Sequence, residues 1–321
     1  MKKNKTLIIF EVLILIGIVF IIAYKSFFME KQENNSYEYS EYYEYNGKKY
    51  KEDDDLELIM FAGLDSYDND IVDSYRNDSL ADCVVLLVLN KEDKTVLPIQ
   101  INRDTMCDYH ILGIGGRIAG DGFGQLALSH SYGSGDVDSL INVKDAVSEM
   151  LTGINIDYYV SIPMEAVSIV NDKAGGVEVY VEDDFSAIDS SIIMGEVNTL
   201  TGSHALTFVR SRKGLDDSSN LARMNRQRVY LRALYEKCKV LVEKDQDFVY
   251  STLNSVGDYI IANTNIYGLS DICNQMIDYK LLDAIKLEGE AKVGQEGYIE
   301  YYVDDDYIKK FSIDHFYKEV K

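Results

Sequence analysis

Arginine side chains are concentrated in one stretch of a chain that is otherwise strongly acidic, with a formal net charge of -22. Residues 208–212 contain two arginines, and residues 221–228 contain three more together with a glutamine. A guanidinium group presents a planar fork of donors that fits two phosphate or carboxylate oxygens at once. The stretch is therefore either a binding site for an oxyanion or a solvated, charged helix surface.

The spacing of these residues favours a shared site. Arg210 and Arg212 alternate, so on an extended segment they lie on one face. Arg223, Arg226 and Gln227 are three and four residues apart, so on a helix they form one stripe. Two separate elements would then direct hydrogen-bond donors into one pocket.

Carboxylates and a further arginine fall at the ends of predicted strands. Asp65 follows one apolar run, Asp82 directly precedes the next, and Arg103 and Asp104 follow a third. In open α/β sheets ligand sites gather at strand ends. Paired carboxylates beside arginines suit a divalent metal that bridges phosphate oxygens. The competing interpretation is that these aspartates form turns.

The elements that must position these groups alternate between strands and helices along the chain. Two strands joined by a short polar segment predict a hairpin, and Pro98 makes its second strand an edge or irregular one. Gly175 and Gly176 are expected to end a helix in a left-handed cap. The predicted strands are 56–62, 83–89, 95–101, 158–162, 177–181 and 298–303, and the predicted helices are 137–151, 164–174, 223–244, 248–261 and 269–279. This order indicates a layered α/β domain with helices on both faces of a central mixed sheet.

The N-terminus has the pattern of a membrane anchor. Lysines in residues 1–6 precede a mainly apolar segment, 7–24, that is just long enough to span a bilayer. The positive-inside rule places residues 1–6 in the cytoplasm and the remainder outside. A cleaved signal peptide is the alternative, but the segment lacks a small-x-small cleavage site. Residues 25–54, rich in Tyr and acidic residues, are predicted to be a flexible tether, and residues 55–321 one extracytoplasmic domain.

Composition excludes several classes of site. The chain has four histidines, and its four cysteines form no CxxC or Cys/His pattern, which argues against zinc. The cysteines are expected to be buried thiols, although Cys83 and Cys107 could pair if their strands are neighbours. The acidic balance argues against a general nucleic-acid binder.

Taken in order, these segments resemble the LytR-CpsA-Psr (LCP) family of bacterial cell-wall enzymes. The resemblance covers nearly the whole domain, and its specificity lies in the ordered set of motifs. The matching segments are Gly63-Leu-Asp65, Asp82 of an Arg-x-Asp motif, Ile101-Asn-Arg-Asp-Thr105, Ser129-His-Ser-Tyr-Gly-Ser-Gly135, Ile156-Asp-Tyr-Tyr-Val160, Gly-Gly-Val at 175–177, Leu200-Thr-Gly-Ser-His-Ala-Leu206, Val209-Arg-Ser-Arg212 and Arg223-x-x-Arg-Gln227.

The resemblance implies an LCP-type α-β-α fold and a Mg²⁺-dependent transferase. Such an enzyme moves a glycopolymer from a polyprenyl-pyrophosphate carrier to a hydroxyl of peptidoglycan, in teichoic acid or capsule assembly. Asp65 and Asp82 would hold the metal, and Asp104 would orient the acceptor hydroxyl. The pyrophosphate would be bound by Arg103, Arg210, Arg212, Arg223 and Gln227. The catalytic residues implied are Arg103, Asp104 and Asp82.

The same resemblance implies the surroundings of the site. The protein would be a single-pass membrane protein of a Gram-positive bacterium, with its C-terminal domain outside the cell. An apolar tunnel for the lipid, lined by strand residues and by residues 137–151, is expected between sheet and helices, although ordinary core packing explains those residues equally well.

This chain departs from the family pattern at three positions. Leu80 stands where the family has the Arg of Arg-x-Asp, Asn102 replaces a Pro, and Ser129 replaces an Asn. Arg76 or Arg117 is a candidate to supply the missing cation. These departures keep an alternative open, in which a membrane-tethered regulatory protein binds polyprenyl pyrophosphate with weak or no turnover. A plain binder of anionic lipids fits poorly with an acidic domain.

Overall fold

The computed structural model describes residues 42–65 and 75–320. The chain divides into a main unit, Glu52–Tyr317, and a small unit formed from the two ends of the chain. The predicted membrane anchor, residues 7–24, lies outside the described residues. None of the helices in the part of the chain that the structure describes has the length and apolar character needed to cross a membrane.

The small unit contains a β-hairpin where a flexible tether was predicted. Strands β1 (Tyr43–Tyr45) and β2 (Lys48–Glu52) are antiparallel, and β16 (Tyr317–Glu319) completes a three-stranded sheet. Asn46 and Gly47 both have positive φ, 51° and 75°, as a two-residue hairpin turn requires. An Asn-Gly pair between alternating tyrosines is typical of a β-hairpin, and the prediction of a flexible tether did not take it into account. The rest of the predicted tether, residues 25–41, lies outside the described part.

The main unit is built on a seven-stranded mixed sheet, as predicted. Its path is β11-β8-β3-β4-β5-β12, with β13 also paired to β5. Strands β3, β4 and β5 are successively antiparallel, which confirms the predicted hairpin, and β8 is parallel to β3. The bounds are β3 Leu56–Leu64, β4 Ala81–Asn90, β5 Thr95–Ile101, β8 Tyr158–Pro163, β11 Ile261–Ala262, β12 Lys280–Leu281 and β13 Ile285–Lys286.

Pro98 lies at an interruption of the sheet. On the outer side of β5, β12 pairs with residues 95–96 and β13 with residues 99–100. Leu97 and Pro98 fall between these two short pairings. A residue without a backbone N–H is tolerated there, because no strand pairs with it on that side. The prediction of an irregular strand is thus confirmed.

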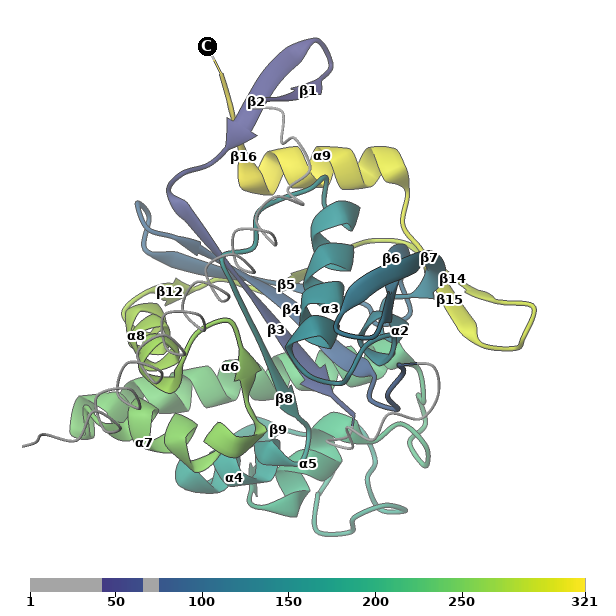
Figure 1. Ribbon diagram of the computed structural model, residues 1–321. Coiled ribbons are helices and arrows are strands. Elements are labelled where there is room, and N and C mark those ends of the chain that lie inside the picture. Colours follow the sequence, from purple (N-terminus) through teal and green to yellow (C-terminus); the bar gives the residue numbers. More distant parts are fainter. Residues whose placement is uncertain (1–41, 66–74, 321) are drawn as a thin grey trace, which may run out of the picture. The chain divides into compact units, whose positions relative to one another are not determined.

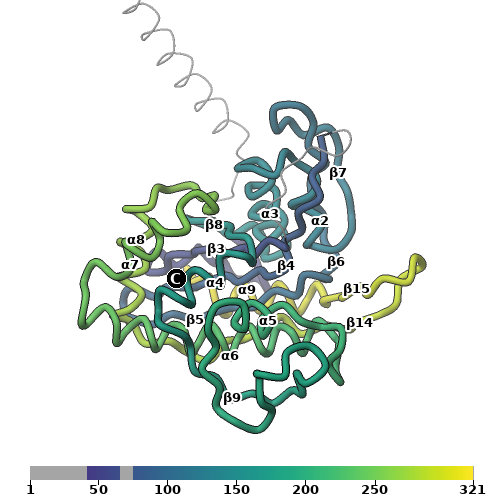
Figure 2. The backbone as a smooth tube through the Cα atoms, turned by 90° about the horizontal axis from the view of Figure 1, so that it is seen from below, coloured from purple at the N-terminus to yellow at the C-terminus, as the bar shows by residue number. Residues whose placement is uncertain are grey.

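Even-numbered and odd-numbered side chains of the strands point to opposite faces of the sheet, where they form two apolar layers. Leu58, Met60 and Ala62 of β3 belong to the largest buried cluster, together with Val143 and Val147 of α3 (Val137–Met150). Ile59 and Phe61 point to the other face, toward α6 (Asn220–Lys244), α7 (Phe248–Ser255) and α8 (Ile266–Ile277). Figures 1 and 2 show α3 and α6 on opposite sides of the strands. The layered α-β-α prediction is confirmed.

A second apolar cluster lies beneath the arginine-rich segments. It joins β9 (Val177–Tyr180), β10 (Val197–Leu200) and α5 (Ser203–Arg210) to α6. Before β9, helix α4 (Ala166–Lys173) ends at Gly175 and Gly176, whose φ values of 73° and 87° confirm the left-handed cap. The remaining elements are α2 Leu128–Ser131, the 3-10 helix Gly257–Tyr259, β14 Glu290–Val293, β15 Ile299–Tyr302 and α9 Asp305–Phe316.

A two-stranded ribbon, β6 (Met106–Gly113) and β7 (Arg117–Gln125), was not predicted from the sequence. Glycines at every second position from 120 to 124 remove the alternating apolar pattern that identifies a strand. Gly122 and Gly124 are needed because the side chain of Tyr109 lies over them. A Cβ at Gly122 would come within 2.7 Å of the Tyr109 ring, whereas a Cβ at Gly120 would have nothing within 4 Å.

We therefore expect Gly122→Ala to destabilise the protein by about 1–3 kcal/mol, because the buried Tyr109 ring must shift. Gly120→Ala, in the same strand, is the matched control and should be neutral or slightly stabilising. Urea unfolding of the two variants measures the difference. Equal unfolding free energies would show that the ring does not constrain the ribbon.

All four cysteines are free thiols, as predicted, but only Cys107 is a buried residue, whereas Cys83, Cys238 and Cys273 are partly exposed. Burial raises the pKa of Cys83, Cys238 and Cys273 to about 11 and that of Cys107 to about 12. The thiols are therefore protonated at neutral pH and behave as apolar side chains.

Candidate active site

Three chain segments with chemically active side chains meet at one edge of the sheet. Asp65 follows β3, Asp82 is the second residue of β4, and Arg103 and Asp104 follow β5. Because β3 and β5 both run antiparallel to β4, the ends of β3 and β5 lie beside the start of β4. The predicted gathering at strand ends is confirmed.

Asp82 lies between two arginines. Its Oδ1 forms an ion pair with Nη1 of Arg103, and its Oδ2 accepts a hydrogen bond of 2.6 Å from Nη1 of Arg223. Arg223 also donates from Nη2 to the Asp82 carbonyl at 3.2 Å. Asp82 and Arg223 are only 8% and 2% exposed. Helix α6 thus contributes its first arginine to a buried charge cluster at the strand ends.

Asp104 occupies the neighbouring position. Its Oδ1 lies 3.4 Å from Nε of Arg103 and accepts a hydrogen bond of 3.3 Å from Nε2 of Gln125. Burial raises the pKa of Asp104, while the positive charges of Arg103, Arg212 and Arg223 act in the opposite direction. Arg212 therefore belongs to the electrostatic environment of this site.

The cluster carries crowded positive charge. Burial lowers the pKa of Arg103, Arg212 and Arg223, and the charge of Arg223 lowers the pKa of the other two further. Guanidinium groups do not release their protons in proteins, so the lowered pKa values express mainly the cost of burying these cations, with a smaller contribution from repulsion by Arg223 at Arg103 and Arg212. An anion bound among them would relieve this repulsion.

Asp65 is attached to the start of β4 rather than to an arginine. Its Oδ1 accepts a hydrogen bond of 2.8 Å from the Leu80 N–H, and its own N–H donates to the Leu80 carbonyl at 3.1 Å. The charge of Asp65 acts to raise the pKa of Arg103 and Arg223, against the larger effect of burial.

Neither candidate replaces the family arginine at Leu80. The guanidinium of Arg76 lies over the Tyr132 ring, 4.2 Å from its centroid. Arg117 starts β7 and pairs with Gly113, at the opposite end of the ribbon from Gln125. The structure thus directs both side chains elsewhere.

We expect Leu80→Arg to strengthen the binding of inorganic pyrophosphate about tenfold, because it adds a cation beside Asp65. Isothermal titration calorimetry in the presence of Mg²⁺ measures the change. Leu80→Met is the control, since it extends the side chain without charge. Equal affinities of the two variants would count against an anion site at this edge.

The expected shared face of Arg210 and Arg212 was wrong. Helix α5 continues to Arg210, and the chain becomes extended only at Ser211. Arg210 is half-exposed, and its Nη1 lies 3.7 Å from Oε1 of Glu165. The apolar residues that precede Arg210 pack as a helix face in the second cluster, which overrides the strand-like alternation.

The residues of the predicted stripe on α6 bind two different parts of the protein. Arg223 reaches Asp82, whereas Arg226 and Gln227 bind the end of α5. Arg226 donates to the carbonyls of Phe208 and Ser211 and to Asp183, and Gln227 donates to the Val209 carbonyl at 3.3 Å. The last carbonyls of a helix lack partners within it, so these side chains supply them.

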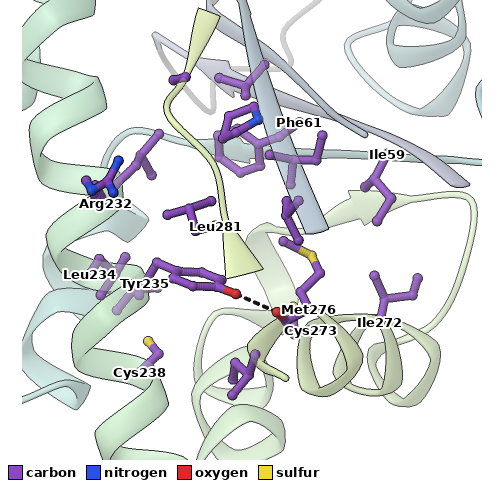
Figure 3. Close-up of a pocket in the computed structure, with 18 of the residues that line it drawn as sticks. Ile59, Phe61, Arg232, Leu234, Tyr235, Cys238, Ile272, Cys273, Met276 and Leu281 are labelled. Carbon is purple, nitrogen blue, oxygen red and sulfur yellow. Dashed lines mark hydrogen bonds between the residues drawn. The ribbon is translucent and has the colours of Figure 1, made fainter. Parts of the chain in front are cut away.

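An apolar cavity of about 660 Å³ lies between the sheet and helices α6, α7 and α8. Figure 3 shows Ile59 and Phe61 of the sheet facing Tyr235 of α6 and Met276 of α8, with the Tyr235 hydroxyl donating to the Met276 carbonyl at 2.5 Å. Its lining is otherwise mostly aliphatic and aromatic, including Val85, Leu87, Val160, Leu234, Phe248, Leu253 and Ile272.

The predicted contribution of residues 137–151 to such a cavity was wrong. Side chains of α3, such as Leu140 and Val147, are fully buried in the core on the opposite face of the sheet. The strand residues were assigned correctly, because the odd-numbered positions of β3 and β4 face the cavity. Sequence periodicity identifies an apolar helix face but not which face of the sheet it covers.

The cavity lies along α6, beyond the helix turn that carries Arg223 of the charge cluster. Gln100, which lines it, donates from Nε2 to the carbonyl of Met224, the residue after Arg223. Its lining on α6 runs from Arg228 to Cys238, about 15 Å at the rise of an α-helix. Arg228 is five residues from Arg223, so the cavity begins about 7.5 Å along the helix from the buried arginine.

The donor set suits Mg²⁺ only together with a ligand. Within residues 42–65 and 75–320, no group of three or more His, Cys, Asp or Glu side chains is arranged to hold a metal. Mg²⁺ commonly uses one or two carboxylates and takes its other oxygens from water and phosphate. Asp65 and Asp82, the two predicted metal ligands, provide two carboxylates at this site, and both oxygens of Asp82 are paired with arginines in the structure.

Three site residues had no role in the sequence interpretation. Asn102, noted only as a departure from the family pattern, and Asn220 are buried beside Arg223, and Gln125 contacts Asp104. Asn220 begins the arginine-rich helix, but its polar type at a helix start is ordinary. Gln125 follows a glycine-rich stretch that carried no strand signal.

Comparison with known proteins places the chain in a family. The LytR_cpsA_psr family matches residues 19–314. A polyisoprenyl-teichoic acid–peptidoglycan teichoic acid transferase, TagU of Bacillus mycoides (strain KBAB4), is 29% identical over 255 residues, which cover 77% of this chain and 73% of TagU.

Two solved structures have a similar fold. TagT bound to LIIa-WTA has a TM-score of 0.60 and 23% identity, over 81% of this chain and 89% of TagT. Bacillus subtilis TagV has a TM-score of 0.61 and 20% identity, over 82% of this chain and 98% of TagV. The family match spans most of the main unit and includes every segment of the charge cluster. The chain therefore belongs to the LytR_cpsA_psr family.

Proposed function

We propose that this protein transfers a glycopolymer from a polyprenyl-pyrophosphate carrier to a hydroxyl of peptidoglycan. The observation that carries the proposal is the apolar cavity that begins one to two helical turns from a buried arginine–carboxylate cluster. This arrangement suits a ligand with an apolar chain and an anionic head. The names of TagU, a teichoic acid transferase, and of TagT bound to LIIa-WTA support the same class of reaction.

In this proposal the lipid chain occupies the cavity and the pyrophosphate lies among Arg103, Arg212 and Arg223. Arg210 is accessible at the end of α5 and would contact the same head group from the solvent side. Gln227 would act through Val209, whose carbonyl it holds, and so orient the segment that carries Arg210 and Arg212.

Asp65 and Asp82 would hold the Mg²⁺. When bound, the metal would neutralise charge on the phosphate oxygens. Arg103 and Arg223, which are ion-paired with Asp82 in the structure, would then turn their donors to the phosphate. A cation and an anion would thus enter the cluster together and leave its charge nearly balanced.

Asp104 is the proposed general base. Burial raises its pKa, which makes the carboxylate a better proton acceptor, and Gln125 holds it in place. Asp104 would take the proton of the acceptor hydroxyl as that oxygen forms a bond to the glycan-linked phosphorus. The bond from this phosphorus to the bridging oxygen would break, and polyprenyl phosphate would leave.

A second candidate is a membrane-tethered regulatory protein that binds polyprenyl pyrophosphate with weak or no turnover. Leu80 favours it, because neither Arg76 nor Arg117, the two candidates within the described residues, is directed to the position where the family pattern has its arginine. The two candidates share the binding site and differ only in the chemical step.

The full-length protein in detergent, supplied with a polyprenyl-pyrophosphate oligosaccharide, a peptidoglycan acceptor and Mg²⁺, tests both. We expect transfer of the oligosaccharide by the wild type and at least a tenfold loss in Leu87→Trp, which fills the cavity. Val240→Trp, on the exposed side of α6, is the control and should retain activity. Lipid binding without transfer would establish the regulatory candidate, and absence of both would refute the site.

A further inference from the structure

Two buried asparagines connect the walls of the charge cluster. Nδ2 of Asn220, on α6, donates to Oδ1 of Asn102, which follows β5, at 2.7 Å. The same Asn102 oxygen accepts a hydrogen bond of 3.0 Å from the Asp104 N–H. Oδ1 of Asn220 accepts two hydrogen bonds from Arg223, 3.1 Å from Nε and 2.6 Å from Nη2.

The partners allow only one orientation of each amide. A guanidinium and a backbone N–H are donors only, so they require the oxygens of Asn220 and Asn102, respectively. Asn220 must then turn its NH₂ group toward Asn102, where the oxygen already accepts from Asp104. A reversal of either amide would lose a hydrogen bond in a site where Asn102 and Asn220 are only 5% and 8% exposed.

We infer that Asn102 and Asn220 form an amide clasp that positions Arg223 relative to Asp104. Through the clasp, the N–H of the proposed base and the guanidinium that reaches Asp82 share one chain of hydrogen bonds. Arg223 holds Asp82 with Nη1, so Nε and Nη2 are the atoms through which its plane is set. The clasp residues touch no reacting atom, and their role is to position. The role in catalysis rests on the proposed function, whereas the role in orienting Arg223 does not.

The structural part of the inference is tested by NMR on the protein in detergent. The Nε–H of Arg223 should exchange slowly with solvent in the wild type and at least tenfold faster in Asn220→Ala. Asn102→Ala should also accelerate it several-fold, although Asn102 does not contact Arg223. Unchanged exchange in Asn102→Ala would overturn the clasp, whether or not the protein is an enzyme.

Carboxylate substitutions provide an asymmetric test. Asn102→Asp keeps an oxygen for both of its donors, so the slow exchange of the Arg223 Nε–H should stay within about threefold of the wild type and kcat should fall less than in Asn220→Asp. Asn220→Asp still accepts from Arg223 but cannot donate. Asn102 would then face it with an oxygen or turn its own NH₂ group against the Asp104 N–H, and kcat should fall at least tenfold. Equal effects of the two substitutions would contradict the clasp.

Two further measurements separate positioning from general stability. The double variant Asn102→Ala/Asn220→Ala should lose no more kcat than the worse single variant, because both break the same chain of bonds. Asn171→Ala removes another buried amide, which binds the Leu200 carbonyl and the Tyr230 hydroxyl. It should lower Tm and leave kcat and KM for the donor unchanged. Additive losses in the double variant would refute the shared chain, and if the wild type shows no transfer, the exchange data alone decide the clasp.

Discussion

Asp82→Asn is expected to bind metal-free inorganic pyrophosphate about tenfold more tightly than the wild type, and to lose transfer activity at least 100-fold. In the structure the Asp82 carboxylate is ion-paired with both Arg103 and Arg223. An anion that enters without a metal must displace it. The amide of Asn leaves the two guanidiniums without this competitor, but it also removes a proposed metal ligand, so binding and turnover should change in opposite directions.

Calorimetry with pyrophosphate in EDTA and the transfer assay in Mg²⁺ measure the two effects. Asp183→Asn is the matched control, because Asp183 is the ion-pair partner of Arg226, outside the proposed anion site. It should lower Tm without changing pyrophosphate affinity. Weaker binding by Asp82→Asn, or retained transfer, would exclude the proposed exchange of Asp82 for phosphate.

Arg226→Met should destabilise the protein by about 2–4 kcal/mol, because each buried acceptor that loses its hydrogen-bond donor costs about 1–3 kcal/mol. Arg226 is 3% exposed and donates to Asp183 at 2.7 Å and to the Phe208 carbonyl at 3.1 Å. Its removal leaves buried acceptors at the end of α5 without donors. Since whole proteins are stable by only about 5–15 kcal/mol, this loss should be visible as a large fall in Tm.

Arg210→Met is the control for this effect. Arg210 is half-exposed and paired at 3.7 Å with an equally exposed Glu165, so the substitution should cost less than about 1 kcal/mol. Thermal unfolding of the two variants compares them directly. Similar values of Tm for the two variants would show that Arg226, like the accessible Arg210, contributes little to stability.

The four longer strands of the sheet, β3, β4, β5 and β8, were predictable from sequence because they are mainly apolar runs, whereas the two-residue strands β11, β12 and β13 were not predicted. The bounds of β5 follow from the local pattern, those of β4 and α6 follow from it to within three residues, and the glycine cap after α4 follows as well. The β6–β7 ribbon does not follow from local sequence. Its Gly122 and Gly124 make room for the Tyr109 side chain, and this is a contact between strands. The placement of α3 on the face opposite the cavity is likewise a property of the packed chain.

The sequence predicted which residues form the site better than it predicted how these residues are arranged. Strand ends located Asp65, Asp82, Arg103 and Asp104 because topology brings such ends together. Their spacing predicts one shared site for Arg223, Arg226 and Gln227. In the folded protein, where all three are buried, Arg223 binds Asp82, whereas Arg226 and Gln227 bind the end of α5.

The parity of β3 and β4 has a consequence for how the protein can diversify. Even positions such as Met60 and Leu86 form the core with α3, while odd positions such as Phe61 and Leu87 face the cavity. Substitutions at the odd positions alter the volume offered to a bound chain without touching that core. One scaffold can thus be retuned for carriers of different length or branching, by evolution or by design, while its framework stays the same.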